Sequence, residues 1–349
     1  MLLLVQVGLK RLRNTGDNKE VLPVSIVIAA RNEQDRIIPC LKSLEQLEYD
    51  TTMYEIIFVD DCSEDKTPQI ISEFVSRHAN WKLFTLRNKS TTLRGKKNAL
   101  LHGIREATGK IICTTDADCE VPAGWLKGMT GFFKPGVTMV LGNSPLKIER
   151  GIVNQFLRFD NMFSAIASAA PTKLGYPFTS VGRNLAYRKD VYENAGGFLA
   201  LKKFKSGDDI HLTERFRYLN TGKIDYCADP NTFVETGQSG DLREIIHQQI
   251  RKNSKIILST WPSVLLALII FSYYVLMVII PFARPSLWWL WLGMFIIKLV
   301  LENIPLNLAN KIFRQQISPF LILFYQLIYP IHIIGFSLLG LFQIYKWKK

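Results

Sequence analysis

The segment Ile111-Ile112-Cys113-Thr114-Thr115-Asp116-Ala117-Asp118-Cys119-Glu120 is a short apolar run that ends in two aspartates one residue apart. The apolar run predicts a buried β-strand. Because side chains alternate along an extended chain, Asp116 and Asp118 are expected to point to the same side at the end of the strand. Two carboxylates placed in this way can hold Mg²⁺ or Mn²⁺ and leave coordination sites open for a phosphate. The pattern is also typical of a solvent-exposed turn, since aspartate is common in turns.

Strand-like and helix-like segments alternate before this segment. Strands are predicted from apolar runs at 24–30, 55–59 and 81–86. Helices are predicted at 37–47, from about 63 to 75, and from 95 to about 109. This alternation favours an α/β domain with a mostly parallel sheet, whose ligands bind outside the carboxyl ends of the strands. Polar residues follow those ends at Arg31, Glu33, Asp60 and Asp61, and again at Asp116 and Asp118.

The alternation fades after residue 122, although a strand at 137–142 and a helix at about 153–170 are still predicted. The next polar motifs are Gly182-Arg183-Asn184, Gly196-Gly197-Phe198 and Gly207-Asp208-Asp209. An amphipathic helix is predicted at 242–252.

The C-terminal part is dominated by apolar and aromatic residues and predicts two or three membrane segments, at about 264–283, 287–304 and 317–345. The third segment is expected to be interrupted at Pro330 and to follow a polar loop at 307–316. Lys298 and Glu302 lie four residues apart and predict an ion pair within the second segment. Basic residues in the loop and at Lys346, Lys348 and Lys349 leave the number and direction of the spans open. We divide the chain into an apolar and basic lead at 1–21, an α/β domain at 22–255 and a membrane region at 256–349.

The net charge of +13 is shared between the two larger parts, and no basic stripe with interleaved aromatic residues is present. This composition favours an anionic membrane face and phosphate-bearing ligands, and it excludes a nucleic-acid partner. Five scattered cysteines predict reduced thiols in the cytosol. Cys113 and Cys119 flank the two aspartates but are not expected to bind metal there, because sulfur is a soft ligand.

The order of these motifs resembles the family-two glycosyltransferases. The motifs are Ala30-Arg31-Asn32-Glu33, Asp60-Asp61, Gly95-Lys96, Asp116-Ala117-Asp118, Gly207-Asp208-Asp209 and Gln248-x-x-Arg251. The resemblance covers residues 22–255 and suggests a membrane-associated, bacterial-type member. It implies a Rossmann-like GT-A fold, a nucleotide-sugar donor, with a UDP-sugar expected, and a divalent metal cofactor, Mg²⁺ or Mn²⁺. It also implies a lipid or glycan acceptor, a place in cell-envelope polysaccharide or glycolipid synthesis, and an inner-membrane location with the catalytic domain in the cytosol.

The resemblance assigns roles to residues on the donor side. Asp60 and Asp61 match the acids that contact the nucleotide base and ribose. Residues of the loop that closes over the nucleotide are matched by Ala30, Arg31 and Glu33, and Lys96 matches a lysine near the nucleotide. Asp118 is expected to be the direct metal ligand, whereas Asp116 is expected to contact the ribose or a metal-bound water.

Further roles fall on the acceptor side and on the last motif. Asp209 matches the general base of an inverting displacement, with Asp208 as the competing candidate. Gly182, Arg183 and Asn184 match the acceptor-side segment. Gln248 and Arg251 match a motif that continues with tryptophan in processive synthases, and Arg251 is expected to pair with the diphosphate. Here lysine, Lys252, replaces that tryptophan, which favours transfer of one sugar or a few.

Three other functions fit parts of the pattern. A processive polysaccharide synthase shares the motifs. Such an enzyme usually has more membrane segments than are predicted here, and it has the tryptophan that Lys252 replaces in this chain. A nucleotidyltransferase acting on a sugar phosphate has similar acid and metal chemistry, but it places a glycine-rich loop after the first strand, where this chain has Ala30-Arg31-Asn32-Glu33. A non-catalytic membrane protein with an inactive sugar-binding domain is disfavoured because every acidic motif is retained.

Overall fold

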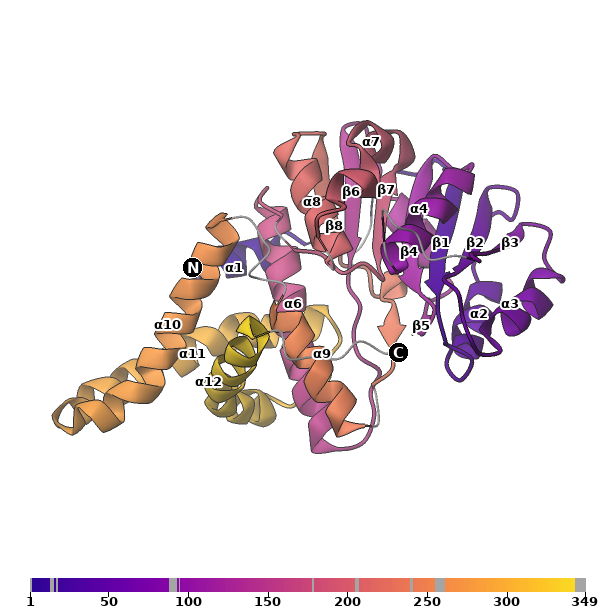
Figure 1. Ribbon diagram of the computed structural model, residues 1–349. Helices are drawn as coiled ribbons and strands as arrows, with labels where there is room; N and C mark the ends of the chain where they lie inside the picture. Colours follow the sequence, from indigo (N-terminus) through magenta and orange to yellow (C-terminus); the bar gives the residue numbers. More distant parts are fainter. Residues whose placement is uncertain are drawn as a thin grey trace. The chain divides into compact units, whose positions relative to one another are not determined.

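The structure is a computed structural model of the 349-residue chain (Figure 1). It describes residues 2–12, 16, 18–87, 93, 95–177, 179–204, 207–238, 241–254 and 261–342, except for the side chains at 261–263 and 266. The chain forms two compact units. The sheet unit contains residues 10–147 and 164–237, and the helical unit contains residues 1–9, 148–163 and 238–349. Helix α6 (Ile152–Lys173) contributes residues to both units.

Within the described residues, the sheet unit is built on seven strands in the order β3-β2-β1-β4-β7-β6-β8 (Figure 1). The strands are β1 (Val24–Ala30), β2 (Tyr54–Asp60), β3 (Trp81–Thr85), β4 (Ile111–Asp116), β6 (Val137–Gly142), β7 (Leu185–Arg188) and β8 (Lys223–Cys227). Among these strands, β7 alone runs antiparallel to its neighbours, β4 and β6. The other pairs are parallel, so the prediction of a mostly parallel α/β sheet is confirmed.

Helices connect these strands. They are α2 (Ile37–Glu45), α3 (Thr67–Val75), α4 (Lys96–Glu106), α5 (Trp125–Thr130), α7 (Lys189–Asn194) and α8 (Asp208–Tyr218). A separate pair of short strands, β5 (Cys119–Glu120) and β9 (Glu235–Thr236), follows the end of β4. The first three helices match the predicted ones, whereas α5, α7, α8, β7 and β8 were not predicted.

The two faces of the sheet are covered by different helices. Alternate residues of β1, such as Ile26 and Ile28, belong to one buried cluster with Leu41 of α2 and Trp125 of α5. Val27 points to the opposite face, where a Cβ atom added at Gly103 of α4 would lie only 2.5 Å from its Cγ1 atom. Helix α4 therefore packs closely on one face of the sheet, and α2, α3 and α5 cover the other.

The helical unit contains α1 (Leu2–Lys10) up to residue 9, the first half of α6, α9 (Leu242–Ser254), α10 (Trp261–Ala283), α11 (Trp288–Ile312) and α12 (Pro319–Leu341). Helix α12 packs against α9, α10 and α11. By length and composition, two described segments could cross a membrane, Pro285–Ile312 and Pro319–Leu341. The apolar part of α10, Ala267–Ala283, is shorter.

Two local predictions for this region were wrong. Residues 307–312, expected in a polar loop, continue helix α11, and the side-chain amide of Asn307 donates to the carbonyl oxygen of Asn303 at 2.8 Å. Helix α12 continues through Pro330 without a break, as is common for proline in long apolar helices. The predicted ion pair of Lys298 and Glu302 is present, with 3.0 Å between Nζ and the carboxylate. The predicted basic tail at Lys346, Lys348 and Lys349 lies outside the described residues.

A buried carboxylate links the amino ends of the central strands. The Oε1 atom of Glu55 on β2 accepts hydrogen bonds from the Ser25 hydroxyl at 2.6 Å and from the backbone and hydroxyl of Thr108 at 2.6 and 2.7 Å. Its Oε2 atom lies 2.7 Å from Nζ of Lys82. Burial would raise the pKa of Glu55, but the hydrogen bonds from Lys82, Ser25 and Thr108 lower it to about 2.

We expect Glu55→Gln to destabilise the sheet unit by about 2 kcal/mol at pH 7, because hydrogen bonds to a charged group contribute about this much each. The folded-state pKa lies below the unfolded value, so the contribution is complete above the unfolded pKa and is lost as pH falls toward 2. The melting temperature should therefore drop by roughly 4–8 °C at pH 7, and by less at pH 4. Glu106→Gln, an exposed change on α4, is the control. An equal effect of the two changes would contradict this account.

Candidate active site

The carboxyl ends of three neighbouring strands form one row at an edge of the sheet. The register pairs Ala30 of β1 with Asp60 of β2, and Ala29 of β1 with Asp116 of β4. The backbone N–H of Asp61 donates to the carbonyl oxygen of Ala30 at 2.8 Å and continues the row beyond β2. The structure thus brings together the acidic strand ends that the sequence analysis grouped.

The loops after β1 and β2 are tied to each other by hydrogen bonds. The backbone N–H of Asn32 donates to the Ser63 hydroxyl at 3.0 Å, and the Asn32 side-chain oxygen accepts from the backbone of Glu64 at 2.9 Å. Asn32 and Cys62 have φ angles of 52° and 57°, in the left-handed region that non-glycine residues rarely adopt. Such backbone conformations persist only where surrounding contacts enforce them, and they cluster at functional sites. The two loops therefore form a preformed wall beside the strand ends.

The predicted nucleotide-side residues lie along this wall. Asp60 is buried. The backbone N–H of Ser63 donates a hydrogen bond to its carboxylate, and both carboxylate oxygens lie 3.3 Å from that nitrogen. Asp61 is also buried, and its Oδ2 atom lies 3.9 Å from Nη1 of Arg31. A Cβ atom added at Gly95, which precedes α4, would lie 3.9 Å from the same oxygen. Asp60 thus shapes the turn, while Asp61 and Arg31 form a pair of opposite charges beside the start of α4.

Glu33 connects this wall to the acids at the end of β4. Its backbone N–H donates to the Thr67 hydroxyl at 2.8 Å, and its carboxylate lies 2.8 Å from Nη2 of Arg36. Burial raises the pKa of Glu33 to about 7; Arg36 opposes this, and the charges of Asp118 and Asp116 add to it. The negative potential of the two aspartates therefore extends to the loop that follows β1.

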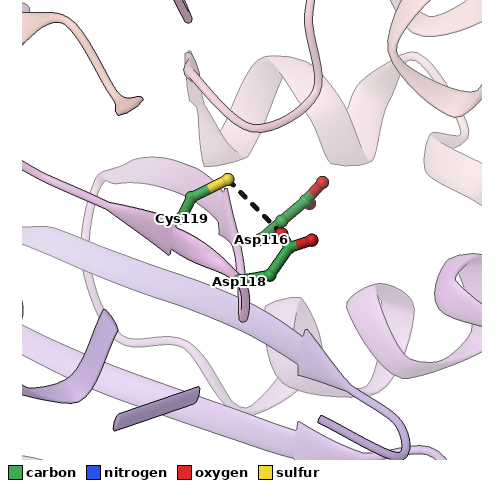
Figure 2. A group of neighbouring side chains, drawn as sticks. All are labelled: Asp116, Asp118 and Cys119. Atoms are coloured by element: carbon green, nitrogen blue, oxygen red, sulfur yellow. Dashed lines mark hydrogen bonds between the residues drawn. The ribbon is translucent and has the colours of Figure 1, made fainter. Parts of the chain in front are cut away.

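Asp116, Asp118 and Cys119 form a group whose possible ligand atoms all lie within 4.8 Å of one another (Figure 2). The Cys119 thiol donates to Oδ1 of Asp118 at 3.5 Å, the contact that is dashed in Figure 2. Burial, followed by the charges of Asp116 and Asp118, raises the pKa of Cys119 well above its usual value. The charged donors of this group are therefore the two carboxylates. They fit a hard cation such as Mg²⁺ or Mn²⁺ and not a thiolate-bound zinc ion.

Lys96, the second residue of the Gly95-Lys96 motif, forms an ion pair with Oδ1 of Asp116. Burial lowers the pKa of Lys96, but the charge and hydrogen bond of Asp116, together with the charges of Asp208 and Asp209, raise it above its ordinary value. The lysine therefore lies in the field of both acidic motifs, the one at the end of β4 and the one at the start of α8.

Asp208 is the first residue of α8, and it follows Gly207, whose φ of 80° requires the left-handed region. Its Oδ1 atom lies 3.1 Å from Nζ of Lys97, a lysine buried in the protein. Lys97 also donates to the backbone oxygen of Phe204 at 2.5 Å. Sequence reasoning missed Lys97, because nothing in the sequence distinguishes it from its neighbour Lys96. The ion pair neutralises Asp208 and anchors the start of α8 to α4.

Asp209 has a different environment. Its Oδ2 atom accepts a hydrogen bond from the backbone N–H of Gly182 at 2.9 Å. A Cβ atom added at Gly182 would lie 3.2 Å from the Cβ atom of Asp209, so the close approach depends on glycine. Asp209 is partly exposed, and its donor among the described residues is the neutral backbone N–H of Gly182. Among the described residues, a buried lysine pairs with Asp208, whereas Asp209 accepts from the neutral N–H of Gly182.

The remaining acceptor-side residues differ in burial. Arg183 is partly exposed, and its Nε donates to the Ser144 hydroxyl at 2.6 Å. Asn184 is fully buried, and its amide donates to the backbone oxygens of Asn143 at 2.6 Å and Thr232 at 2.8 Å. Its Oδ1 atom accepts from the Trp125 indole at 2.9 Å. Asn184 therefore holds the start of β7 through buried hydrogen bonds, and its side chain does not face solvent.

We expect Asn184→Ala to act on stability, because the buried Thr232 carbonyl oxygen and the Trp125 indole N–H lose their hydrogen bonds to Asn184, while the Asn143 carbonyl oxygen keeps the one from the backbone N–H of Val234. The cost should be about 2–4 kcal/mol, measured as a lower melting temperature of the purified protein. The Michaelis constant for the acceptor should stay within about twofold for the protein that remains folded. A higher constant with unchanged stability would instead show that Asn184 acts on the acceptor.

Gln248 and Arg251 lie on α9 in the helical unit. The next residue, Lys252, stands where the processive enzymes have tryptophan, and its Nζ atom lies 2.6 Å from Oδ2 of the buried Asp160 on α6. The hydroxyl of Tyr329 on α12 donates to Oδ1 of Asp160 at 3.2 Å. The lysine therefore serves the packing of α6, α9 and α12. Its pairing could not be predicted, since Asp160 is distant in the sequence.

A mostly parallel sheet flanked by helices, with acidic loops at its carboxyl edge, is the architecture of a GT-A domain. The mannosyltransferase PcManGT from Pyrobaculum calidifontis, solved in complex with GDP-Man and Mn²⁺, has this fold, with a TM-score of 0.60 at 18% identity. The likeness covers 98% of this chain and 91% of that one. Residues 25–195 match the model of Glycosyl transferase family 2. Residues 25–195 therefore form a domain of this family, as the motifs predict.

Two curated relatives show how far the similarity extends. The glycosyltransferase AglE of Haloferax volcanii is 28% identical over 193 residues, which are 55% of this chain and 60% of the relative. The beta-monoglucosyldiacylglycerol synthase of Nostoc sp. is 37% identical over 111 residues, which are 32% of this chain and 23% of the relative. The chain thus spans less than two thirds of the length of either relative.

Proposed function

We propose that this protein transfers one sugar from a nucleotide-sugar donor, in the first instance a UDP-sugar, to a lipid acceptor at a membrane. The proposal includes a divalent metal ion, inversion at the anomeric carbon, and catalysis on the cytosolic side of the inner membrane. The observation that carries it is the gathering of carboxylates at one sheet edge: Asp61 after β2, Asp116 and Asp118 after β4, and Asp209 on α8. The names of the relatives and the two long apolar helices support a membrane lipid acceptor.

In this proposal, the donor lies along the wall formed by the first two loops. Asp60 and Asp61 accept hydrogen bonds from the base and ribose, and Arg31 closes over the nucleotide. Asp116 and Asp118 hold the metal ion, which when bound offsets the charge of the diphosphate leaving group. Lys96 sits beside these acids and can shift its ion pair from Asp116 to a phosphate oxygen. Gln248 and Arg251 are proposed to act at the diphosphate. Ala30 is proposed to lie in the loop that closes over the nucleotide.

The acceptor hydroxyl is deprotonated by Asp209 as its oxygen attacks the anomeric carbon. The bond from that carbon to the diphosphate breaks in the same step, so the configuration inverts and a nucleoside diphosphate leaves. The Gly182 N–H keeps one oxygen of Asp209 fixed and leaves the other for the proton. Lys97 holds Asp208 in an ion pair, which favours Asp209 as the base. Lysine at position 252, where processive enzymes have tryptophan, favours release after one transfer.

The test is transfer by the purified full-length protein in lipid nanodiscs. UDP-glucose, UDP-N-acetylglucosamine and GDP-mannose are each supplied with Mn²⁺ or Mg²⁺, and lipid extracts serve as acceptors. We expect release of a nucleoside diphosphate together with one glycolipid whose linkage is inverted, as read by nuclear magnetic resonance. Release of pyrophosphate, a polymeric product, or a retained configuration would each contradict the proposal.

A further inference from the structure

Within the helical unit, helix α12 packs against α6 and α9 along most of its length. The hydroxyl of Tyr325 donates to Oε1 of Gln155 on α6 at 3.3 Å. Tyr329, next to the middle of α12, donates to the buried Asp160 on α6. Near the end of α12, a Cβ atom added at Gly340 would lie 3.0 Å from the backbone nitrogen of Ser254 on α9. These contacts fix the beginning, middle and end of α12 against its two neighbours.

The middle of α12 lies beside an ion pair that reaches the protein surface. Asp160, which accepts from Tyr329, is bound at 2.6 Å by Nζ of Lys252 on α9. The side chain of Lys252 is 42% exposed, whereas that of Asp160 is 5% exposed. Arg243 and Gln248 of α9 are exposed as well. The helix that packs beside the midpoint of α12 therefore has a polar and accessible surface.

This arrangement conflicts with a membrane-spanning α12. The hydrocarbon core of a bilayer is about 30 Å thick, and the 23 residues of α12 extend over about 34 Å. A crossing helix would place Tyr329 near mid-depth, about 15 Å from water, and would bring Lys252 and Asp160 to the same depth. Charged side chains are costly at the centre of a bilayer. Length and composition allow α12 to cross a membrane, but the charged groups beside its middle oppose it.

The opposite side of α12 is an apolar, exposed stripe, which we call the apolar face. Phe320, Leu327, Ile331 and Leu338 lie on it and are between 44% and 76% exposed. They follow one another at intervals of seven, four and seven residues, which place them on one side of a helix. An apolar stripe opposite a polar partner surface is typical of a helix that lies in the membrane interface, with its apolar side among the lipids.

Basic residues flank α12 on both sides. Lys311 and Arg314 precede it and are exposed, and Lys346, Lys348 and Lys349 follow it in the sequence. Basic segments next to membrane helices are usually retained on the cytoplasmic face. A crossing α12 would separate these two segments, whereas a helix in the plane of one leaflet keeps both on the same face. There they can contact anionic headgroups.

We propose that α12 lies in the plane of the bilayer surface and does not cross the bilayer. The apolar face enters the headgroup and upper acyl region of one leaflet, and α6 and α9 cover the other side of the helix. The partner of this surface is a leaflet that contains anionic phospholipid. The inference goes beyond the proposed function and does not depend on sugar transfer. It gives an interfacial place to the third predicted membrane segment, for which the sequence left the number and direction of spans open.

The experiment measures the depth of spin labels on the full-length protein in nanodiscs that contain anionic phospholipid. Phe320→Cys, Ile331→Cys and Leu338→Cys are made singly in a Cys62→Ser background, since the other four native thiols are buried. Electron paramagnetic resonance compares collisions with oxygen, which concentrates in lipid, and with a nickel complex, which stays in water. We expect all three labels about 5–10 Å below the headgroups, with no maximum at Ile331. The Cys62→Ser protein alone gives the background signal.

Arg243→Cys on the exposed side of α9 is the matched control, and its label should collide mainly with the nickel complex. A crossing α12 predicts a different profile. The label at Ile331 would then lie about 15 Å deep. The label at Phe320, eleven residues away, would lie near water, because a helix rises about 1.5 Å per residue.

A second measurement determines on which side of the membrane the two basic segments lie. Lys311→Cys and Lys348→Cys are made singly in the same background and treated with a membrane-impermeant maleimide. The protein is in sealed membrane vesicles of one orientation, and labelling is compared before and after permeabilisation. We expect the two positions to react from the same side.

Four results would overturn the inference. They are a depth maximum at Ile331, labels on the apolar face that all lie in water, labels that neither oxygen nor the nickel complex reaches, and reaction of Lys311→Cys and Lys348→Cys from opposite sides. The third result would mean that protein, such as a second copy of this chain, covers the apolar face. None of these readouts uses a sugar donor, so loss of the inference would leave the proposed function intact, and the absence of transfer would leave the inference intact.

Discussion

Asp209→Asn will reduce sugar transfer by about 10²–10⁴-fold, the usual contribution of a general base. The amide cannot accept the proton of the acceptor hydroxyl. It still has one carbonyl oxygen, which can accept the Gly182 N–H that Asp209 accepts at 2.9 Å. The substitution should therefore leave the fold and donor binding unchanged, and the loss should appear in kcat with little change in the KM for the donor.

Asp208→Asn is the comparison that decides between the two candidate bases. It breaks the pair with the buried Lys97, at 3.1 Å, and leaves that lysine with backbone oxygens as its partners. We expect a lower melting temperature and a smaller loss of transfer than in Asp209→Asn. Asp190→Asn, an exposed change in the first turn of α7, should have no effect and serves as the control. Greater loss in Asp208→Asn, at equal stability, would make Asp208 the base.

The part of the fold that was predictable is the part whose strands contain several consecutive apolar residues. β1 and β2 lie inside the parallel sheet and are covered by helices on both faces, so their sequences are nearly continuous apolar runs. β8 is different, because it contains Asp225, which is buried and lies 2.6 Å from Nζ of Lys173. A buried acid in a five-residue strand removes the apolar signal. The lysine that neutralises it comes from α6, and no local pattern in the sequence could connect the two.

Helix α8 was missed for a related reason. Its buried side chains include His211 and Glu214, whose Nδ1 and Oε2 atoms lie 3.4 Å apart. The helix thus buries polar groups that pair with each other, and it lacks the apolar stripe from which helices are recognised. The motif at its start, Gly207-Asp208-Asp209, was nevertheless identified. It was recognised by its resemblance to the family-two glycosyltransferases and not from the periodicity of apolar residues.

For the candidate site, the rule that ligands bind at the carboxyl ends of parallel strands was enough to group Asp60, Asp61 and Asp116. Their common row follows from the register of adjacent strands. The partners that separate the roles of Asp208 and Asp209 are Lys97 and the backbone of Gly182, which come from other segments. Tertiary pairing of this kind is not encoded in any local spacing, so the sequence left the choice of base open.

Asp118→Asn should remove metal-dependent transfer and weaken Mn²⁺ binding by at least about 100-fold, because loss of a ligand should exceed the 10–100-fold effect of losing a supporting contact. Electron paramagnetic resonance of Mn²⁺ with the purified protein and UDP measures binding directly and does not require activity. Asp116→Asn should weaken binding as well, but it also releases Lys96 from its ion pair. Its effect is therefore a sum of two changes, and Asp118→Asn is the cleaner measurement.

Cys119→Ser distinguishes a carboxylate site from a mixed one. The Cys119 thiol lies within 4.8 Å of the carboxylate oxygens, so geometry alone allows it to be a third ligand. Burial, with the charges of Asp116 and Asp118, raises its pKa, and a protonated thiol is a poor ligand. We therefore expect Cys119→Ser to keep the affinity for Mn²⁺ and to leave the affinity for Zn²⁺ unchanged. Lower affinity for Zn²⁺ or Cd²⁺ in this variant, with Mn²⁺ binding unchanged, would mean that the thiolate forms when a soft metal arrives. The site would then select its metal by protonation of Cys119 as well as by its two carboxylates.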